Sequence, residues 1–563
     1  MKRLIAIIVF IHVFATAYSQ HTYCNPLNLD YRYSLSMPSR REAADPTMIM
    51  FKNEYYLFAS KSGGYWHSKD LLNWDLITTK DLPLEDYAPT TVIVDNEIYF
   101  MASGGHIKIY KTTDPKSGKW EVVNDDFPIG LTDPCLFFDD DRRMYLYYGC
   151  SNKEPLYAVE LDLKNKLNPI GKPVATIYGN NKEHGWDNTG DYNENAVNAP
   201  WVEGSWMNKY HGKYYLQYAT PGTQFKSYAD VVYVSDLPFG PFKLQKSNPF
   251  SYKPEGFIAG AGHSSTFCDV YGNYWHIATM TISKIHMFER RLGLFPSGFD
   301  KDATLYTNTA FGDYPHYIPN KKFMNAGDLF TGWMLLSYKK PVEASSAIDS
   351  LPSKNAVDED VRTYWSAKSG NKGEWLCVDL EKQCDVYALQ INFADHNTNL
   401  LGRDNESAYQ YVVQYSNDKI HWETLIDKSN NIEDLPHDYI ELPKVINARY
   451  VKITNYHMPD GTFALSGFRV FGKGKGKLPE QVKNFTIERS GTDRKTVKIS
   501  WDKIPNALGY NIRYGIARDK LYLNYQVYAD TSIIIRSLDV NTDYYFTIDS
   551  FNENGITKGV QVH

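Results

Sequence analysis

One phrase returns five times in the first part of this sequence, and it limits the fold more than any other feature. In residues 44–60, ADPTMIMFKNEYYLFAS, an Asp-Pro opens an apolar run, a Lys-Asn pair interrupts it, and a Tyr-rich run closes it. Aromatic and apolar runs on both sides of a polar turn predict a β-hairpin, and a proline at a strand start costs no hydrogen bond. Similar phrases begin at Ala88, Asp133, Ala199 and Ala261. The chain therefore contains five copies of one hairpin.

A second recurring phrase predicts the outer strands of each unit. It appears as HSKDLLNWDLI from His67, KTTDPKSGKWEVV from Lys111 and VSDLPFGPFKL from Val234. Units of about four antiparallel strands, with the first copies about 45 residues apart, are typical of propeller blades. We predict an all-β chain whose residues 20–320 form a five-bladed β-propeller. A pair of β-sandwiches also shows evenly spaced short strands, but it gives no reason for a whole phrase to recur.

A propeller would bring distant acidic residues together. The first strand of every blade lines the central axis in this fold, so corresponding positions converge on one funnel. Those positions carry Asp45, Asp133, Glu203 and His263. Turn chemistry also explains an aspartate before a proline. It explains Glu203 poorly, because this residue lies among apolar and aromatic residues where an unpaired charge is costly.

These acids resemble the motifs of glycoside hydrolase family 43. Asp45 in ADPT, Asp133 in TDPC and Glu203 in VEGS follow its three acidic motifs in order and spacing, within residues 25–317. The resemblance implies inverting hydrolysis of glycosidic bonds, with Asp45 as general base, Glu203 as general acid, and Asp133 as orienting residue and pKa modulator. Family members often have a proline where this chain has Ser205. Inverting hydrolysis needs about 6.5–9.5 Å between base and acid, which leaves room for a water molecule.

Further candidates concern the substrate and a metal. Trp66 and Trp201 predict apolar walls or sugar platforms, and core packing explains each equally well. Strand alternation predicts that either Arg290 or Arg291 points inward to bind sugar hydroxyls or Asp133, and the alternative is a surface pair. His263 matches a family histidine, which implies a structural Ca²⁺ on the axis. Ca²⁺ prefers oxygen ligands, so a core histidine is the alternative. No organic cofactor is predicted.

The N-terminus predicts export. Lys2 and Arg3 precede an apolar run and small residues, so residues 1–19 read as a secretory signal peptide, too short for a spanning helix. We expect a secreted or periplasmic protein with no membrane-spanning segment. The formal charge of -6 over 563 residues argues against nucleic acid as a partner, and an aromatic content of 15 % suits sugar-binding surfaces.

Six cysteines are too few for a disulfide scaffold in a chain of this size. Cys135 and Cys150 lie at opposite ends of the third hairpin, and Cys377 and Cys384 flank another turn. In an exported protein either pair could form a disulfide, and burial as thiols is equally plausible. No Cys/His spacing indicates a zinc site.

The hairpin phrase ends near residue 320, and different strand patterns follow. Residues 321–340 predict a bridging segment. Residues 341–472, which include EWLCVDLEKQCDVYALQINFAD and ALSGFRVFG, resemble a discoidin-like (coagulation factor 5/8 C-type) domain. This resemblance implies a jelly-roll β-sandwich that either binds sugars or lipid headgroups or serves as a spacer.

The last part of the chain predicts a third unit. Residues 473–478 belong to a Gly/Lys linker. Residues 479–563 resemble a fibronectin type III β-sandwich, with Trp501 in its core and Leu538 and Tyr544 on its later strands. We expect this unit to display or space the enzyme.

Together these features predict an exported, inverting glycoside hydrolase that removes α-L-arabinofuranosyl or β-D-xylosyl residues from plant polysaccharide or oligosaccharide. The alternatives are an exo-acting galactosidase of the same family and a catalytically inactive carbohydrate-binding propeller. The sugar itself is not readable from the sequence, because specificity depends on loop shape and hydroxyl contacts.

Overall fold

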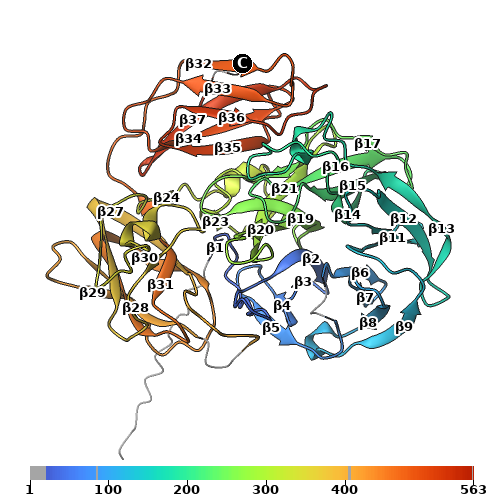
Figure 1. Cartoon of the computed structure of the whole chain (residues 1–563), viewed down its shortest axis with the longest axis horizontal. Coiled ribbons are helices and arrows are strands. Elements are labelled where there is room, and N and C mark those ends of the chain that lie inside the picture. The colour runs from blue at the N-terminus through green and yellow to red at the C-terminus, as the bar shows by residue number, and fades with distance from the viewer. Residues whose placement is uncertain (1–20, 84–86, 404–407, 561, 563) are drawn as a thin grey trace, which may run out of the picture.

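The computed structural model describes residues 21–83, 87–403, 408–560 and 562 (Figure 1). Almost all of its regular structure is β-strand, which confirms the all-β prediction. The helical segments of this part are short 3-10 turns, namely η1 (Pro115–Ser117), η2 (Gly185–Asp187), η3 (Ala326–Leu329) and η4 (Ser353–Val357). None of its helices has the length and apolar character needed to cross a membrane. The predicted signal peptide, residues 1–19, lies outside the described residues.

Five antiparallel sheets follow one another through the first part of the chain, and in each the strands pair in chain order. The first and second sheets contain β2 (Ala44–Phe51), β3 (Glu54–Ser60), β4 (Gly64–Ser68) and β5 (Asp75–Thr78), then β6 (Thr90–Val94), β7 (Glu97–Met101), β8 (Ile107–Thr112) and β9 (Glu121–Phe127). The third contains β10 (Cys135–Phe138), β11 (Met144–Tyr148), β12 (Leu156–Asp162) and β13 (Asn168–Ile177). The fourth and fifth contain β14 (Glu203–Tyr210), β15 (Lys213–Thr220), β16 (Ala229–Ser235), β17 (Lys243–Leu244) and the added β18 (Ser251–Tyr252), then β19 (Ala259–Cys268), β20 (Tyr274–Thr281), β21 (Arg290–Phe299) and β22 (Leu305–Thr307). The five predicted hairpins are the first two strands of these sheets.

The first strands of the sheets form a closed ring. Strand β2 contacts β6, β6 contacts β10, β10 contacts β14, β14 contacts β19, and β19 returns to β2. Hydrogen bonds join neighbours in this ring, as from the Leu136 N–H to Thr90 Oγ1 at 3.0 Å. The five sheets fan outward from the ring (Figure 1).

Apolar clusters fill the space between neighbouring sheets. Between the first and second sheets, the Phe58 ring stacks on Tyr65 at a centroid distance of 4.6 Å and meets Phe100 at 5.8 Å. Phe58 is fully buried, so its replacement by alanine would cost about 3–5 kcal/mol. Aromatic residues favour such half-covered strand surfaces, which is why Tyr and Phe dominate the hairpins.

The N-terminal segment is tied to the fifth sheet. Strand β1 (Thr22–Tyr23) pairs with β23 (His316–Tyr317). The Asn25 side-chain amide donates to the Leu294 and Gly312 carbonyls at 2.8 and 2.7 Å, and its oxygen accepts from the Leu294 N–H at 2.9 Å. These bonds attach the chain start to the sheet that precedes the C-terminal regions.

Residues 334–473 form one eight-stranded antiparallel sheet around a separate apolar core. Its strands are β24 (Met334–Leu335), β25 (Val342–Ala344), β26 (Trp365–Ser366), β27 (Trp375–Phe393), β28 (Gln410–Ser416), β29 (Glu423–Lys428), β30 (His437–His457) and β31 (Ala464–Lys473). Because β24 pairs with β31, the predicted bridging segment contributes an edge strand to this sheet.

The C-terminal region consists of two sheets packed on one core. Their strands are β32 (Phe485–Arg489), β33 (Val497–Trp501) and β36 (Ser532–Ile535), and β34 (Gly509–Gly515), β35 (Leu523–Tyr528), β37 (Tyr545–Asn552) and β38 (Gly555–Thr557). Trp501 is buried in this core, as predicted. Leu538 is buried there too, but it and Tyr544 lie in the connection between β36 and β37, not on the later strands where the prediction put them. The Tyr544 hydroxyl accepts the Asp539 N–H at 3.1 Å. The fibronectin type III assignment stays a prediction.

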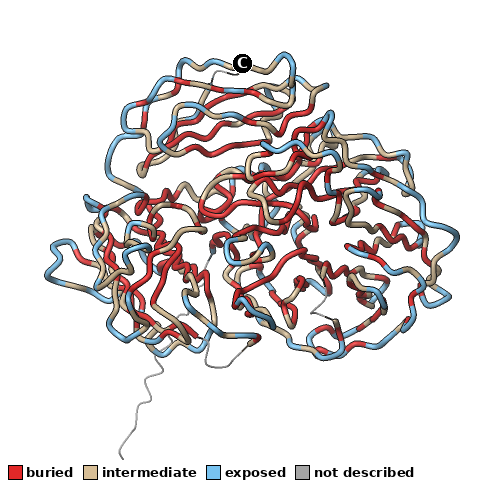
Figure 2. Tube along the Cα trace, in the orientation of Figure 1, coloured by how far each residue is buried: buried red, intermediate tan, exposed pale blue. Residues whose placement is uncertain are grey.

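The three regions share buried contacts (Figure 2). Arg469 on β31 is buried and pairs with Glu359, while its second amino group donates to the Asp313 carbonyl at 2.7 Å. Breaking a buried pair of this kind by removing one partner costs about 3–5 kcal/mol. The C-terminal core also includes Tyr252 of the fourth sheet.

Candidate active site

In three of the five sheets, the first strand carries a β-bulge near its N-terminal end. The pairing with the second strand shifts between Ala44 and Thr47 in β2, between Glu203 and Trp206 in β14, and between Gly262 and Ser265 in β19. One residue in each bulge has a positive φ, 53° at Asp45, 64° at Gly204 and 42° at His263. Bulges of this kind redirect side chains and are common beside active sites. The repeat thus gives these strands one shared kink at their starts.

Glu203 is one residue out of step with Asp45. It pairs with Ala219 as Ala44 pairs with Ser60, so its structural equivalent is Ala44, whereas the prediction placed Glu203 and Asp45 at corresponding positions. The reason is Gly204, which adopts the left-handed φ of the kink. A Cβ there would come within 2.6 Å of the His263 ring. Glycine is therefore required at 204, and the carboxylate comes from the residue before it.

Asp45 is buried and fully engaged. Its Oδ2 accepts the Ser60 hydroxyl at 2.6 Å, and its Oδ1 lies 3.1 Å from Nη1 of Arg290 and 3.2 Å from Nδ1 of His263. Burial acts to raise the pKa of Asp45, but Arg290 and His263 outweigh it, so this pKa lies below its ordinary value. Asp45 is therefore ionised at neutral pH.

Asp133 and Glu203 form a close carboxyl pair. Their nearest carboxyl oxygens lie within 4.8 Å of each other, and Asp133 Oδ2 accepts the Gly204 N–H at 3.2 Å. Burial, followed by the negative charges of Glu203 and Asp45, raises the pKa of Asp133 to about 7, although His263 opposes this shift. Two such carboxyls cannot both ionise without mutual repulsion, so the pair binds a proton near neutral pH.

Glu203 is the more accessible member of the pair, and two side chains orient it. The Tyr228 hydroxyl donates to Oε1 at 2.6 Å and the Cys150 thiol donates to Oε2 at 3.1 Å. Tyr228 is fully buried. Burial, and then the charge of Glu203, raises the pKa of the Cys150 thiol far above its ordinary value, so Cys150 stays protonated and able to donate.

His263 lies between the acids. Its Nδ1 is 3.2 Å from Asp45 and 3.8 Å from Asp133, while its backbone N–H donates to Asp230 at 2.9 Å. Burial acts to lower the pKa of His263, but Asp45, Asp133 and Glu203 raise it above the ordinary value. The raised pKa favours the protonated imidazole, whose charge would partly balance the acids.

The direct donors at this place do not fit calcium. Among the described residues, the group with metal-ligand spacing consists of Asp133, Cys150 and Glu203. Ca²⁺ takes six to eight oxygen ligands, whereas this group offers a protonated thiol and a coupled carboxyl pair, and the Nδ1 of His263 faces Asp45. The calcium site at His263 stays a prediction from the family resemblance, and no step below depends on it.

The other predicted residues divide into two groups. Arg290 reaches Asp45, and Trp201 is 42 % exposed two residues before Glu203. The structure does not bring Trp66 or Arg291 to the acids. Trp66 is buried between the first and fifth sheets, and Arg291 turns the other way, where its Nε donates to His437 of β30 at 2.7 Å. Both arginines are buried, so the alternative of an exposed surface pair is wrong.

Cys150 and Tyr228 are the site residues that sequence reasoning missed. The sequence allows a disulfide between Cys135 and Cys150, but all six cysteines are free thiols in the structure. Its position at the close of the third hairpin was a usable signal, because that end faces the start of β14: Ser151 forms a bridge with Val202. Tyr228 precedes β16 and had no readable signal.

Comparison with known proteins supports two of the predicted domains. Residues 39–305 match the glycosyl hydrolases family 43, and residues 341–466 match the F5/8 type C domain. Both resemblances stated from the sequence are thereby confirmed.

Several known proteins are similar to parts of this chain. A beta-xylosidase of Xylanibacter ruminicola is 34% identical over 130 residues, which are 20% of this chain and 39% of that protein. A xylosidase/arabinosidase of Butyrivibrio fibrisolvens is 27% identical over 269 residues, 41% of this chain and 48% of that protein. The chain thus spans less than half the length of either relative. The crystal structure of a family 43 protein of Bacillus licheniformis aligns over 96% of this chain and 97% of its own, with 15% identity and a TM-score of 0.42.

Proposed function

We propose that this chain, whose residues 39–305 form a glycosyl hydrolases family 43 domain, hydrolyses glycosidic bonds with inversion and releases β-D-xylosyl or α-L-arabinofuranosyl residues from plant polysaccharide or oligosaccharide. The observation that carries the proposal is the contrast among the three acids. Asp45 is kept ionised, while the pKa of Asp133, raised to about 7 by burial and then by the charges of Glu203 and Asp45, lets the carboxyl pair beside it hold a proton near neutral pH. An inverting glycosidase needs this division between a base and an acid.

Asp45 is suited to the role of general base. Arg290 and His263 keep it charged, and Ser60 fixes one of its oxygens. In the proposed reaction Asp45 takes a proton from a water molecule, and that water attacks the anomeric carbon on the face opposite the leaving group. The bond from the anomeric carbon to the leaving oxygen breaks as the new one forms.

Glu203 is suited to the role of general acid, because it is the less buried carboxyl of the pair and Asp133 is fixed by the Gly204 N–H. In the proposed reaction Glu203 enters protonated and gives this proton to the leaving oxygen. Tyr228 and Cys150 then donate hydrogen bonds to the carboxylate that remains. Hydrogen bonds to a charged group are worth about 1.5–3 kcal/mol each, so these two contacts favour proton release.

The leaving group provides the sharpest test of this assignment. A dinitrophenolate leaves without protonation, whereas a sugar alcohol does not. The Glu203→Gln variant should therefore retain hydrolysis of a dinitrophenyl pentoside and lose xylobiose or arabinobiose hydrolysis by at least about a hundredfold. The Asp45→Asn variant, the matched control, should lose both activities. Equal losses on both substrates in the Glu203 variant would refute its role as acid.

The choice of a pentose as the released sugar rests on the names of the relatives. The predicted export rests on the sequence alone. Activity on a panel of nitrophenyl β-xyloside, α-arabinofuranoside and galactosides tests the choice of sugar. Preferential release of galactose would mean that the substrate is a galactoside and not a pentoside. Release from no glycoside and no plant glycan would favour the inactive carbohydrate-binding propeller.

The ring of first strands supports a five-bladed propeller as part of the proposal. Export by residues 1–19 also belongs to it, and comparing the N-terminus of the secreted and the cytoplasmic product would test it.

A further inference from the structure

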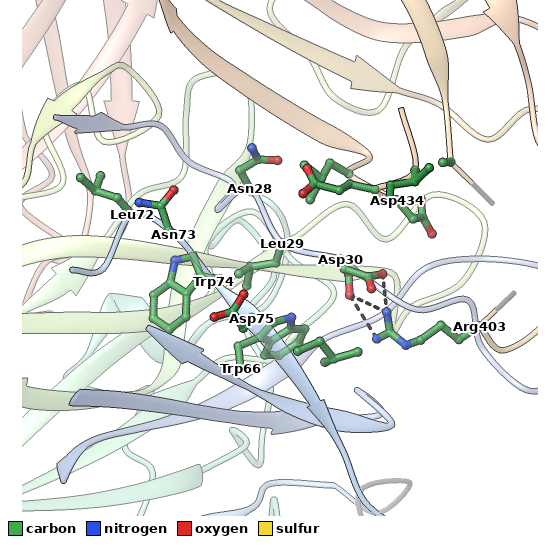
Figure 3. Close-up of a pocket in the computed structure, with 15 residues that line it drawn as sticks. Asn28, Leu29, Asp30, Trp66, Leu72, Asn73, Trp74, Asp75, Arg403 and Asp434 are labelled. Atoms are coloured by element: carbon green, nitrogen blue, oxygen red, sulfur yellow. Dashed lines mark hydrogen bonds and ion pairs between the residues drawn. The ribbon is translucent and has the colours of Figure 1, made fainter. Parts of the chain in front are cut away.

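A pocket lies beside the first sheet, on the side away from β2, the strand that carries Asp45 (Figure 3). Its volume is about 740 Å³, within the usual range for ligand sites. One wall comes from residues 28–30 and from strands β4 and β5 with their connection. The other wall comes from Arg403, Ala408 and residues 432–435 of the second region. Asp45 lies on β2, and the sheet order β2-β3-β4-β5 separates it from this pocket.

The pocket combines indole rings with polar groups. Trp74 is the half-buried indole of the wall, since Trp66 is fully buried, and Asn73 and Asp75 are exposed at the rim. Across the pocket Arg403 forms an ion pair with Asp30 (Figure 3). Apolar sugar faces pack on indole rings, and sugar hydroxyls bind carboxylates and amides. This mixture of surfaces fits a carbohydrate better than an apolar ligand.

Unsatisfied polar atoms gather at the walls. The buried atoms Asn28 Oδ1, Trp66 Nε1, Arg403 Nε and Asp434 Oδ1 have no hydrogen-bond partner among the described residues. Each such atom costs about 1–3 kcal/mol unless water or a ligand satisfies it. Because these four atoms have almost no accessible surface, they show that the pocket wall is polar but are not themselves direct partners of a ligand.

The charges of the pocket exclude an anionic ligand. Arg403 is paired with Asp30, and Asp434 accepts from Arg41 at 2.6 Å. The remaining charged side chains of the lining, Asp75 and Glu433, are both negative and exposed. A phosphate, a sulfate or a uronic acid would meet repulsion here, whereas a neutral sugar would not.

We propose that this pocket binds a neutral oligosaccharide and is a carbohydrate site distinct from the catalytic acids. Because its walls come from both the catalytic part and the second region, bound sugar would contact both. The site extends the proposed function and does not depend on it, since its argument uses none of the catalytic residues.

Binding to the full chain tests the proposal. Isothermal titration of the Glu203→Gln protein with xylotetraose, arabinotetraose and galactotetraose should show a site for at least one probe that Trp74→Ala, added to the same protein, weakens at least tenfold. Asp75→Ala, at the exposed rim, provides a second variant whose folding is not at stake and should weaken the same site. Trp422→Ala, a half-buried tryptophan of the second region outside the pocket, is the matched control and should leave binding unchanged.

The outcomes separate this site from the proposed function. Binding that none of the pocket variants alters, for all three probes, would overturn the proposal. Variants that bind as weakly as predicted but show altered far-UV circular dichroism would also count against it. A chain that releases no sugar yet binds a tetrasaccharide through Trp74 would keep this site and lose the proposed hydrolase function.

Discussion

Removing the charge of Asp133 should shift the pH dependence of hydrolysis in one direction. The Asp133→Asn variant keeps the size of the side chain and an oxygen that can accept the Gly204 N–H. It removes the negative charge that makes the Asp133–Glu203 pair retain a proton near neutral pH. With that charge gone, the remaining carboxyl ionises at lower pH, so the basic limb of the kcat/KM profile should move down.

The separation of the two carboxyls sets the size of the shift. At the upper limit of 4.8 Å for their separation, two unit charges repel by roughly 3.5 kcal/mol at an effective dielectric constant of about 20, and by about half of that at 40. Since about 1.4 kcal/mol corresponds to one pKa unit, the limb should move by about 1 to 2.5 pH units. Glu203 is partly exposed and solvent screens the repulsion, so the lower half of this range is expected.

The assay is kcat/KM against pH on xylobiose or arabinobiose, whose leaving groups need a proton. Asp139→Asn is the matched control, because Asp139 is a buried aspartate that pairs with Lys209 away from the three acids, and it should leave the limb in place. A basic limb that stays put or moves upward in a folded Asp133→Asn protein would refute the reasoning.

Three further substitutions test the surroundings of the acids. In Arg290→Gln the Asp45 carboxylate loses its nearest cation, so its pKa rises. The acidic limb of the kcat/KM profile should therefore move up by about 1–3 pH units, and an unmoved limb would contradict that account. Tyr228→Phe should lower kcat by about tenfold to a hundredfold, with KM nearly constant, and a change confined to KM would speak against its orienting role. Cys150→Ser should keep most activity and Cys150→Ala lose more. Iodoacetamide at pH 7 should hardly inactivate the native protein, and rapid inactivation would mean that the thiol is not the protonated donor described.

The sequence predicted the ring of acids because the same hairpin recurs. Repetition places equivalent strands side by side, and the Asp-Pro openings mark where those strands begin. The sequence contains a further signal that the prediction did not use. A serine or threonine hydroxyl near the end of a hairpin accepts a hydrogen bond from a backbone N–H at the start of the neighbouring sheet. Ser60 accepts from Ala88 at 2.7 Å, and Ser103 accepts from Asp133 at 2.9 Å. Thr279 accepts from Asp45 at 2.8 Å and so closes the ring.

Contacts between distant segments could not be predicted. Tyr228 reaches Glu203 from the connection before β16, and nothing in its local sequence shows it. Trp66 and Trp201 look alike in sequence, yet the first fills a core and the second stays exposed, because only packing decides between them. The pocket beside the first sheet likewise joins residues 28–30 to residues 432–435, which no sequence pattern connects.

The configuration of the first-formed sugar tests the central claim most directly. Proton NMR of the native protein acting on a β-xyloside, recorded before mutarotation, should show α-xylose first, because water activated by Asp45 attacks opposite the departing oxygen. Initial release of β-xylose would contradict an inverting mechanism and with it the roles given to Asp45 and Glu203.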